Sequence, residues 1–143
     1  MYATALMEPS GNSWRILAAS PVLVVDDVPA SAAFFRDVLG FAVGFVTDQP
    51  HGFANVDRDG FEVHLVQASA PGARNSVAAA SVHGSDLFFR VENVDAAYER
   101  MAAAGAETDG PPEDRVYEFR DFGVRDPNGY SLRFGQALPR GSS

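Results

Sequence analysis

The chain has 143 residues, a length that suits one domain, and a formal net charge of −8 with no cysteine and no lysine. These features exclude disulfides, thiolate catalysis, cysteine-type zinc sites and Schiff-base chemistry on a lysine. The acidic charge disfavours nucleic-acid binding. No apolar run approaches the roughly 18 residues of a membrane span, and no Lys or Arg precedes Arg15, which is not the flank of a secretory signal. We therefore expect a cytoplasmic protein with no nucleic-acid or membrane partner.

The first half begins with a short apolar run that predicts a strand. Asp27 follows it as a helix-capping residue, and an Ala-rich pattern predicts a helix over residues 29–39 that ends at Gly40. Further strands are expected near residues 42–47 and 52–56. Asp59 and Gly60 then form a dipeptide typical of tight hairpins, and the residues after it alternate in the manner of a strand.

The second half repeats this order. A short apolar run leads to the capping residue Asn93, and a helix is predicted over residues 95–104. Strands are expected at 106–108 and 116–124. The Asn128-Gly129 dipeptide is a second hairpin signal, followed by another alternating run.

The repeat indicates two related modules, each reading as strand, helix and about three strands. The first module is predicted at residues 14–69 and the second at 83–137. Residues 70–82 are small, polar and Gly/Pro-containing, as expected of a linker. Residues 138–143 are predicted to be a disordered tail.

Two motifs carry a family resemblance: VPASAAFFRDVLGF over residues 28–41 and VRDPNGYSLRF over 124–134. With the repeated modules, they resemble the glyoxalase/bleomycin-resistance/dioxygenase (vicinal oxygen chelate) superfamily, especially its bleomycin-resistance-like members, over residues 17–136. The resemblance implies an α+β fold in which two βαβββ modules form a curved, mixed but mostly antiparallel sheet around a cleft, with helices outside. It also implies a homodimer with clefts at or near the subunit interface.

In metal-dependent relatives, each module supplies ligands from its first and last strands. By resemblance, the four positions here are Ser20, His64, Asp86 and Arg133. Only His64 and Asp86 are suitable ligands, because an arginine has no lone pair and would repel the ion. We therefore expect no metal and no cofactor. A purely structural interpretation is that Asp86 pairs with Arg133 or Arg90, and that His64 bonds to a neighbour such as Glu62 or Gln67.

Strand alternation assigns the two faces of the strands. Together with the aromatic segment before the second hairpin, the resemblance predicts that these residues line a ligand-binding cleft: Ser20, Glu62, His64, Asp86, Phe88, Arg90, Tyr117, Phe119 and Arg133. Aromatic rings there can stack on a planar ligand, although any single ring can instead pack in the core or a dimer interface. The opposite face is apolar and predicts the core: Leu23, Val25, Phe61, Val63, Leu65, Leu87, Phe89, Val91, Leu132 and Phe134.

The sequence favours a metal-independent protein that binds a small molecule, such as a drug or a metabolite, over an enzyme. No catalytic residue is assigned, because no nucleophile stands beside a base and an orienting group. The main alternative is a divalent-metal lyase, isomerase or dioxygenase that uses His64, Asp86 and a third ligand such as Glu62 or Glu118. A domain that binds another protein is a third. The net charge fits a cationic ligand, whereas Arg90 and Arg133 favour an anion, and the sequence leaves this conflict open.

Overall fold

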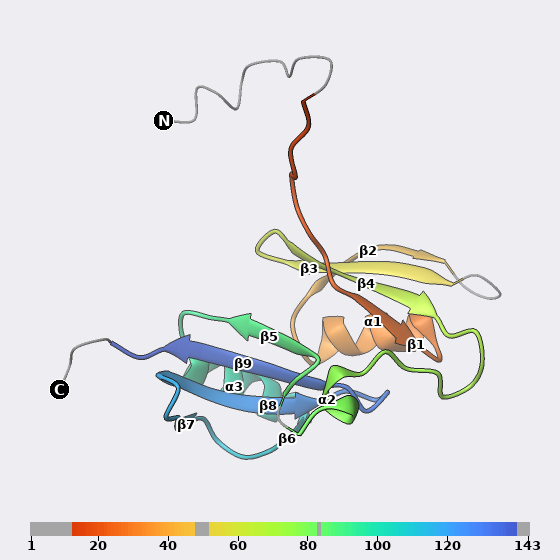
Figure 1. The fold of residues 1–143 in the computed structure, drawn as a ribbon. Coiled ribbons are helices and arrows are strands. Elements are labelled where there is room, and N and C mark those ends of the chain that lie inside the picture. Colours follow the sequence, from red (N-terminus) through yellow and green to blue (C-terminus); the bar gives the residue numbers. More distant parts are fainter. Residues whose placement is uncertain (1–12, 48–51, 83, 140–143) are drawn as a thin grey trace.

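Two open β-sheets, one from each half of the chain, make up the fold in the computed structural model, which describes residues 13–47, 52–82 and 84–139 (Figure 1). The elements of the first half are β1 (Val22–Val25), α1 (Val28–Asp37), β2 (Ala42–Thr47), β3 (Phe53–Arg58) and β4 (Phe61–Gln67). A short helix, α2 (Val77–Ala80), precedes the second half. The second half contains β5 (Leu87–Arg90), α3 (Val94–Ala103), β6 (Glu107–Thr108), β7 (Glu113–Asp114), β8 (Phe119–Arg125) and β9 (Ser131–Ala137).

Both sheets have the same mixed topology. The first has the strand order β1-β4-β3-β2 and the second β5-β9-β8-β6, with the short β7 also paired to β8. The parallel pairs are β1 with β4 in the first sheet and β5 with β9 in the second, and the other pairings are antiparallel. Val22 is paired with His64 in one sheet and Phe88 with Arg133 in the other. The predicted α+β class with two related modules is therefore confirmed.

The two long helices begin at the predicted capping residues. The Asp27 side chain accepts a hydrogen bond of 2.9 Å from the backbone N–H of Ala30, and Asn93 accepts one of 3.1 Å from that of Ala96. These bonds satisfy N–H groups that have no partner within the helix. The predicted helix positions are confirmed to within two residues at each end.

The predicted strand over residues 116–124 is wrong at its start. Residues 116–118 form the turn between β7 and β8, closed by a 2.7 Å hydrogen bond from the backbone N–H of Arg115 to the carbonyl oxygen of Phe119. Glu118 closes this turn with a φ of 68°, a left-handed conformation usually taken by glycine. Because no glycine marks the turn, the sequence pattern does not reveal it.

One hydrophobic cluster joins the two halves. Phe41 of the first half packs edge-on against Phe89 of the second, with 5.7 Å between ring centroids. Six of the ten predicted core residues are buried, and Leu87, Phe89 and Val91 are half-buried against the cluster. Phe61 is a wrong prediction: its exposed fraction is 73%, because it directly follows the hairpin turn and its ring extends past the core.

The segment between the sheets is tied to both of them. The Asn75 amide nitrogen donates to the carbonyl oxygen of Val22 at 2.8 Å, and its side-chain oxygen accepts from the N–H of Val24 at 3.2 Å. Arg74 pairs with Asp26 at 2.8 Å and donates to the carbonyl oxygen of Asn128 at 3.0 Å. These bonds hold the edge strand β1 beside the hairpin turn that precedes β9.

No helix in the described residues is long and apolar enough to cross a membrane. Of the predicted disordered tail, Leu138 is held by a 2.9 Å hydrogen bond from its N–H to the carbonyl oxygen of Glu118. Residues 140–143 of that tail lie outside the described residues.

Candidate functional site

The predicted cleft residues of the first half lie on the face of the first sheet opposite the core. His64 lies on β4 with its Nε2 atom 2.8 Å from Glu62 Oε1, and the Phe53 ring stands edge-on to it at 5.3 Å. The structural pairing of His64 with Glu62 is thus observed. Ser20 precedes β1 and is half-buried.

Asp86 makes neither of the two ion pairs considered for it. Its carboxylate accepts hydrogen bonds from the backbone N–H groups of Ser131, at 2.8 Å, and Ala78, at 3.2 Å. That pairing prediction is wrong because Asp86 lies just before β5, where two backbone donors from the start of β9 and from α2 reach it first. Asp86 therefore fastens α2 to the second sheet.

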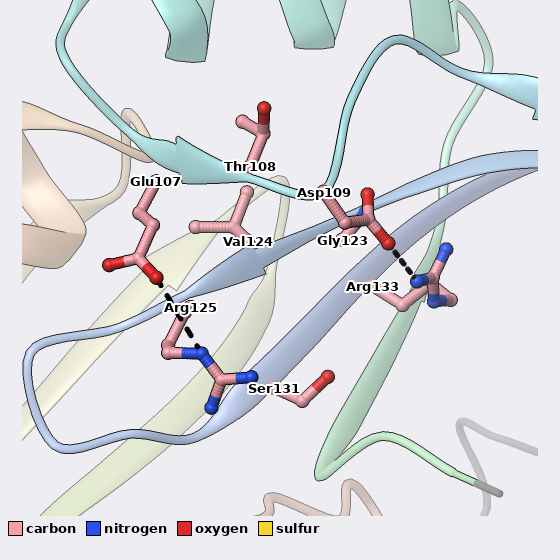
Figure 2. A pocket seen from close by; sticks show the side chains of 8 residues that line it. All are labelled: Glu107, Thr108, Asp109, Gly123, Val124, Arg125, Ser131 and Arg133. Carbon is pink, nitrogen blue, oxygen red and sulfur yellow. Dashed lines mark hydrogen bonds and ion pairs between the residues drawn. The ribbon is translucent and has the colours of Figure 1, made fainter.

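Arg133 is held between two carboxylates. Its two terminal nitrogens donate to Asp121 Oδ1 at 2.8 Å and to Asp109 Oδ2 at 2.5 Å. Gly123 makes room for the guanidinium, since a Cβ atom there would lie 2.9 Å from the Arg133 nitrogen. Figure 2 shows this side chain pointing to Asp109 across the strand that carries Gly123. The cation at the expected ligand position is neutralised locally.

Asp121 is a site residue that the sequence analysis missed. It is fully buried on β8 and also accepts a hydrogen bond of 2.8 Å from Arg115 Nε and one of 2.5 Å from the Tyr117 hydroxyl. Burial raises the pKa of Tyr117, and the hydrogen bond to Asp121 raises it further. Tyr117 therefore remains a neutral donor at physiological pH. The only sign of Asp121 in the sequence is its position between Phe119 and Phe122, in the aromatic segment before the second hairpin.

The predicted aromatic residues of the second half meet on the same face. Phe88 packs edge-on against Phe119 with 5.3 Å between centroids, and the Arg90 guanidinium lies 5.9 Å from the centre of the Phe119 ring. The Phe88 ring lies directly against Gly135, where a Cβ atom would be only 2.6 Å from the ring. A residue without a side chain is therefore needed at position 135. Phe88 remains 44% exposed, so its ring is available to a ligand.

A pocket of about 170 Å³ opens beside Arg133 (Figure 2). It is lined by Glu107, Thr108, Asp109, Gly123, Val124, Arg125, Ser131 and Arg133. Of the predicted cleft residues, only Arg133 lines it. The β6 residues were missed because sequence periodicity does not reveal which strand lies beside β8. A second hollow of about 310 Å³ adjoins the pocket and shares Arg125 and Ser131 with it.

The structure does not bring the predicted cleft residues together in one place. Glu62 and His64 lie in the first sheet and Ser20 just before its strand β1, whereas Phe88, Phe119 and Arg133 lie in the second sheet. Within the described residues, no hydrogen bond or ion pair links the two groups.

The four expected ligand positions do not fit a metal ion. Within residues 13–47, 52–82 and 84–139, no three His, Asp or Glu side chains gather into a group able to hold one. Ser20 is a poor ligand and Arg133 is not one, while Asp86 has its oxygens on backbone N–H groups. No chemistry through a metal can be derived from these side chains.

A family model described as the Glyoxalase/Bleomycin resistance protein/Dioxygenase superfamily matches residues 17–134. The chain belongs to this superfamily. A bleomycin resistance protein of Geobacillus stearothermophilus is 29% identical over 86% of this chain and 98% of its own length.

Solved structures of the superfamily share the fold. A bleomycin-binding protein from the bleomycin producer Streptomyces verticillus, in complex with copper(II)-bleomycin, is 28% identical. It aligns over 90% of this chain and 100% of its own, with a TM-score of 0.64. A glyoxalase/bleomycin resistance protein/dioxygenase from Nocardioides is 26% identical over 98% of this chain and 93% of its own, with a TM-score of 0.63.

Proposed function

We propose that this superfamily member binds and sequesters a small molecule, such as a drug or a metabolite, without a metal ion. The observation that carries this proposal is the position of Arg133 and its ion pairs. It occupies a position expected of a metal ligand, and it is fixed there by ion pairs to Asp109 and Asp121 at 2.5 and 2.8 Å. A metal ion could bind at this position only if this network were broken and Arg133 moved away.

Bleomycin-type glycopeptides are the first ligands to test. The relatives named above include a bleomycin resistance protein at 29% identity and a bleomycin-binding protein at 28% identity. The aromatic pair Phe88 and Phe119 offers a ring surface of the kind on which a planar group can stack.

We also infer that the chain is a homodimer. The face of the first sheet that carries His64 exposes Val22 and Phe45. Exposed apolar groups of this kind suit an interface, and a second copy would cover this face. Light scattering after size-exclusion chromatography should give a mass of about 31 kDa, twice the 15.3 kDa of one chain. A mass of one chain at micromolar concentration would overturn this inference.

The binding proposal is tested by thermal shift with a panel of bleomycin-type glycopeptides and other planar antibiotics. A ligand at a hundred times its dissociation constant stabilises the native state by about 2.7 kcal/mol, which is a shift of several degrees for a domain of this size. Phe88→Ala should reduce the shift. The matched control Phe61→Ala, which removes an exposed ring from the other sheet, should leave it unchanged. No shift across the panel would contradict the proposal.

Metal independence is tested on the same preparation. Elemental analysis of untagged protein should find no stoichiometric Mn, Fe, Ni or Zn, and added divalent ions should not raise the melting temperature. Ligand shifts should persist in a chelator. Stoichiometric metal would overturn this part of the proposal and favour the enzyme alternative, while Arg133→Glu would reveal whether the position can regain metal binding.

A further inference from the structure

The lining of the pocket beside Arg133 carries two carboxylates, Glu107 and Asp109, and two guanidinium groups, Arg125 and Arg133, and ion pairs connect it to further charged groups. Arg133 contacts Asp109 and Asp121, and Asp121 also holds Arg115, which lies 3.5 Å from Glu113. Arg125 faces Glu107 at 3.7 Å. The whole network thus holds four carboxylates and three guanidinium groups, of which Asp121, Glu113 and Arg115 lie behind the lining.

Arg133 directs its charge to two carboxylates. Both of its terminal nitrogens are engaged, and the exposed fraction of its side chain is 22%. It also lies close against the backbone at Gly123, where a Cβ atom would be within 2.9 Å of it. Asp109 is itself held by the N–H of Gly123 at 2.8 Å, so neither partner can turn away easily.

Glu107 is the acceptor most open to a ligand. Its side chain is 74% exposed, and its pairing with Arg125, at 3.7 Å, is longer than a hydrogen bond. Thr108 and Ser131 add hydroxyl groups to the lining. Arg90, the other predicted cleft cation, is not among the residues that line the pocket.

We propose that Asp121 and Asp109 are specificity-determining residues that cancel the charge of Arg133, so that this pocket accepts cationic groups and rejects anionic ones. This inference deepens the proposed function, on which its biological meaning rests, by assigning the charge class of the ligand group that enters the pocket. The net charge of the chain favours a cationic ligand, whereas Arg133 alone would favour an anion. Because Arg133 is paired with Asp109 and Asp121, its charge is cancelled and no longer opposes a cationic ligand.

The test uses two planar probes of similar size and opposite charge, benzamidine and benzoate. Binding to ¹⁵N-labelled protein is followed by NMR at the Gly123 amide and the Arg133 Nε–H group. The native protein should bind benzamidine at least tenfold more tightly than benzoate. Asp109→Asn should shift the ratio of dissociation constants roughly tenfold toward benzoate, because one unit charge is removed within a few ångströms of the probe. Asp121→Asn should act in the same direction.

A fallback variant and a matched control complete the test. If Asp121→Asn does not fold, Asp109→Asn decides alone, because its side chain is half-exposed and an asparagine oxygen can still accept from Gly123. The matched control is Asp95→Asn, which removes a carboxylate paired with Arg120 outside the pocket and should leave the ratio unchanged.

Equal binding of both probes to the native protein, an unchanged ratio in Asp109→Asn, or no binding of either probe would each overturn the inference. The thermal-shift panel gives a separate answer. If an antibiotic raises the melting temperature but the two probes bind equally, the proposed function stands and the inference about charge is wrong. If the probes are discriminated but no antibiotic raises the melting temperature, the inference about charge stands and the proposed function is contradicted.

Discussion

The hydroxyl of Tyr130 donates a hydrogen bond of 2.6 Å to the carbonyl oxygen of Val24, which lies in the other sheet. Tyr130 is fully buried just before β9. The bond joins residues 106 positions apart in the chain, and the same hydroxyl accepts from the N–H of Asn75 at 3.3 Å. One side chain therefore fastens the first sheet, the second half and the connecting segment together.

Replacing Tyr130 with Phe should lower the free energy of unfolding by about 1–2 kcal/mol, because the ring remains while a partly buried carbonyl and N–H lose their partner. Urea denaturation measures this loss. Tyr98→Phe is the matched control: it keeps the ring that packs against Phe122, and it should cost clearly less. Equal losses for the two variants would show that the Tyr130 hydroxyl does not fasten the sheets.

Removing either helix cap should destabilise the chain. Asp27→Ala and Asn93→Ala should each cost about 1 kcal/mol, since each leaves an N–H group of the first helical turn without its acceptor. The caps lie in different helices, so the double variant should lose the sum of the two effects in urea denaturation. A double variant no less stable than either single one would mean that the repeated caps do not act independently.

Acid should weaken the link between Asp26 and Arg74. The side-chain hydrogen bond from Arg74, with the backbone N–H of Gly72, lowers the pKa of Asp26 to about 2 from its ordinary 3.8. A lowered pKa in the folded state gives stability above the unfolded value, and this stability is lost as pH falls through the folded value. Asp26→Asn should thus be less stable than the native chain at pH 6, and the difference should shrink between about pH 4 and pH 2.

Urea midpoints measured from pH 2 to pH 7 check this dependence. Arg74→Gln should give the same pH profile, since it removes the partner of Asp26. Asp126 contributes in the opposite sense, because burial raises its pKa and its share of stability falls as pH rises. A stability difference between the native chain and Asp26→Asn that stays constant over the whole range would exclude the ion pair as its source.

Adding a methyl group at position 135 should disturb the aromatic face. In Gly135→Ala the new Cβ would lie 2.6 Å from the Phe88 ring, too close for any carbon pair. Forcing the ring aside should cost about 1–3 kcal/mol in thermal or urea unfolding. In a Phe88→Ala background the same change should cost much less, and a cost unaffected by that background would place the clash elsewhere.

Features coded by short-range sequence signals were predictable. Asp27 and Asn93 are oxygen-bearing residues directly before helical patterns, and each caps its helix. Asp59 and Gly60 both adopt positive φ values, of 54° and 85°, as their hairpin signal indicated. The equivalent positions of His64 and Arg133 were also predictable from aligning the two halves. His64 lies on β4 and Arg133 on β9, and each of these strands pairs in parallel with the first strand of its half.

Features that depend on which strands become neighbours were not predictable. Asp109 and Asp121 reach Arg133 only because β6 and β9 both pair with β8, and no periodicity in the sequence states that order. Tyr117 was placed in a strand because Glu118, and not a glycine, occupies the left-handed position of its turn. Phe61 fits the alternation of β4, but it is the first residue of that strand and lies past the edge of the hydrophobic core, so its ring is exposed.

The bonds between Asn75 and β1 affect more than the placement of the connecting segment. An exposed edge strand offers unpaired N–H and C=O groups on which a strand of another molecule can add, a common start of aggregation. The Asn75 side-chain amide donates to the carbonyl oxygen of Val22 and accepts from the N–H of Val24, much as a peptide group of a neighbouring strand would. Together with the Tyr130 hydroxyl, which donates to the carbonyl oxygen of Val24, the Asn75 side chain covers this edge, and an incoming strand would first have to displace both.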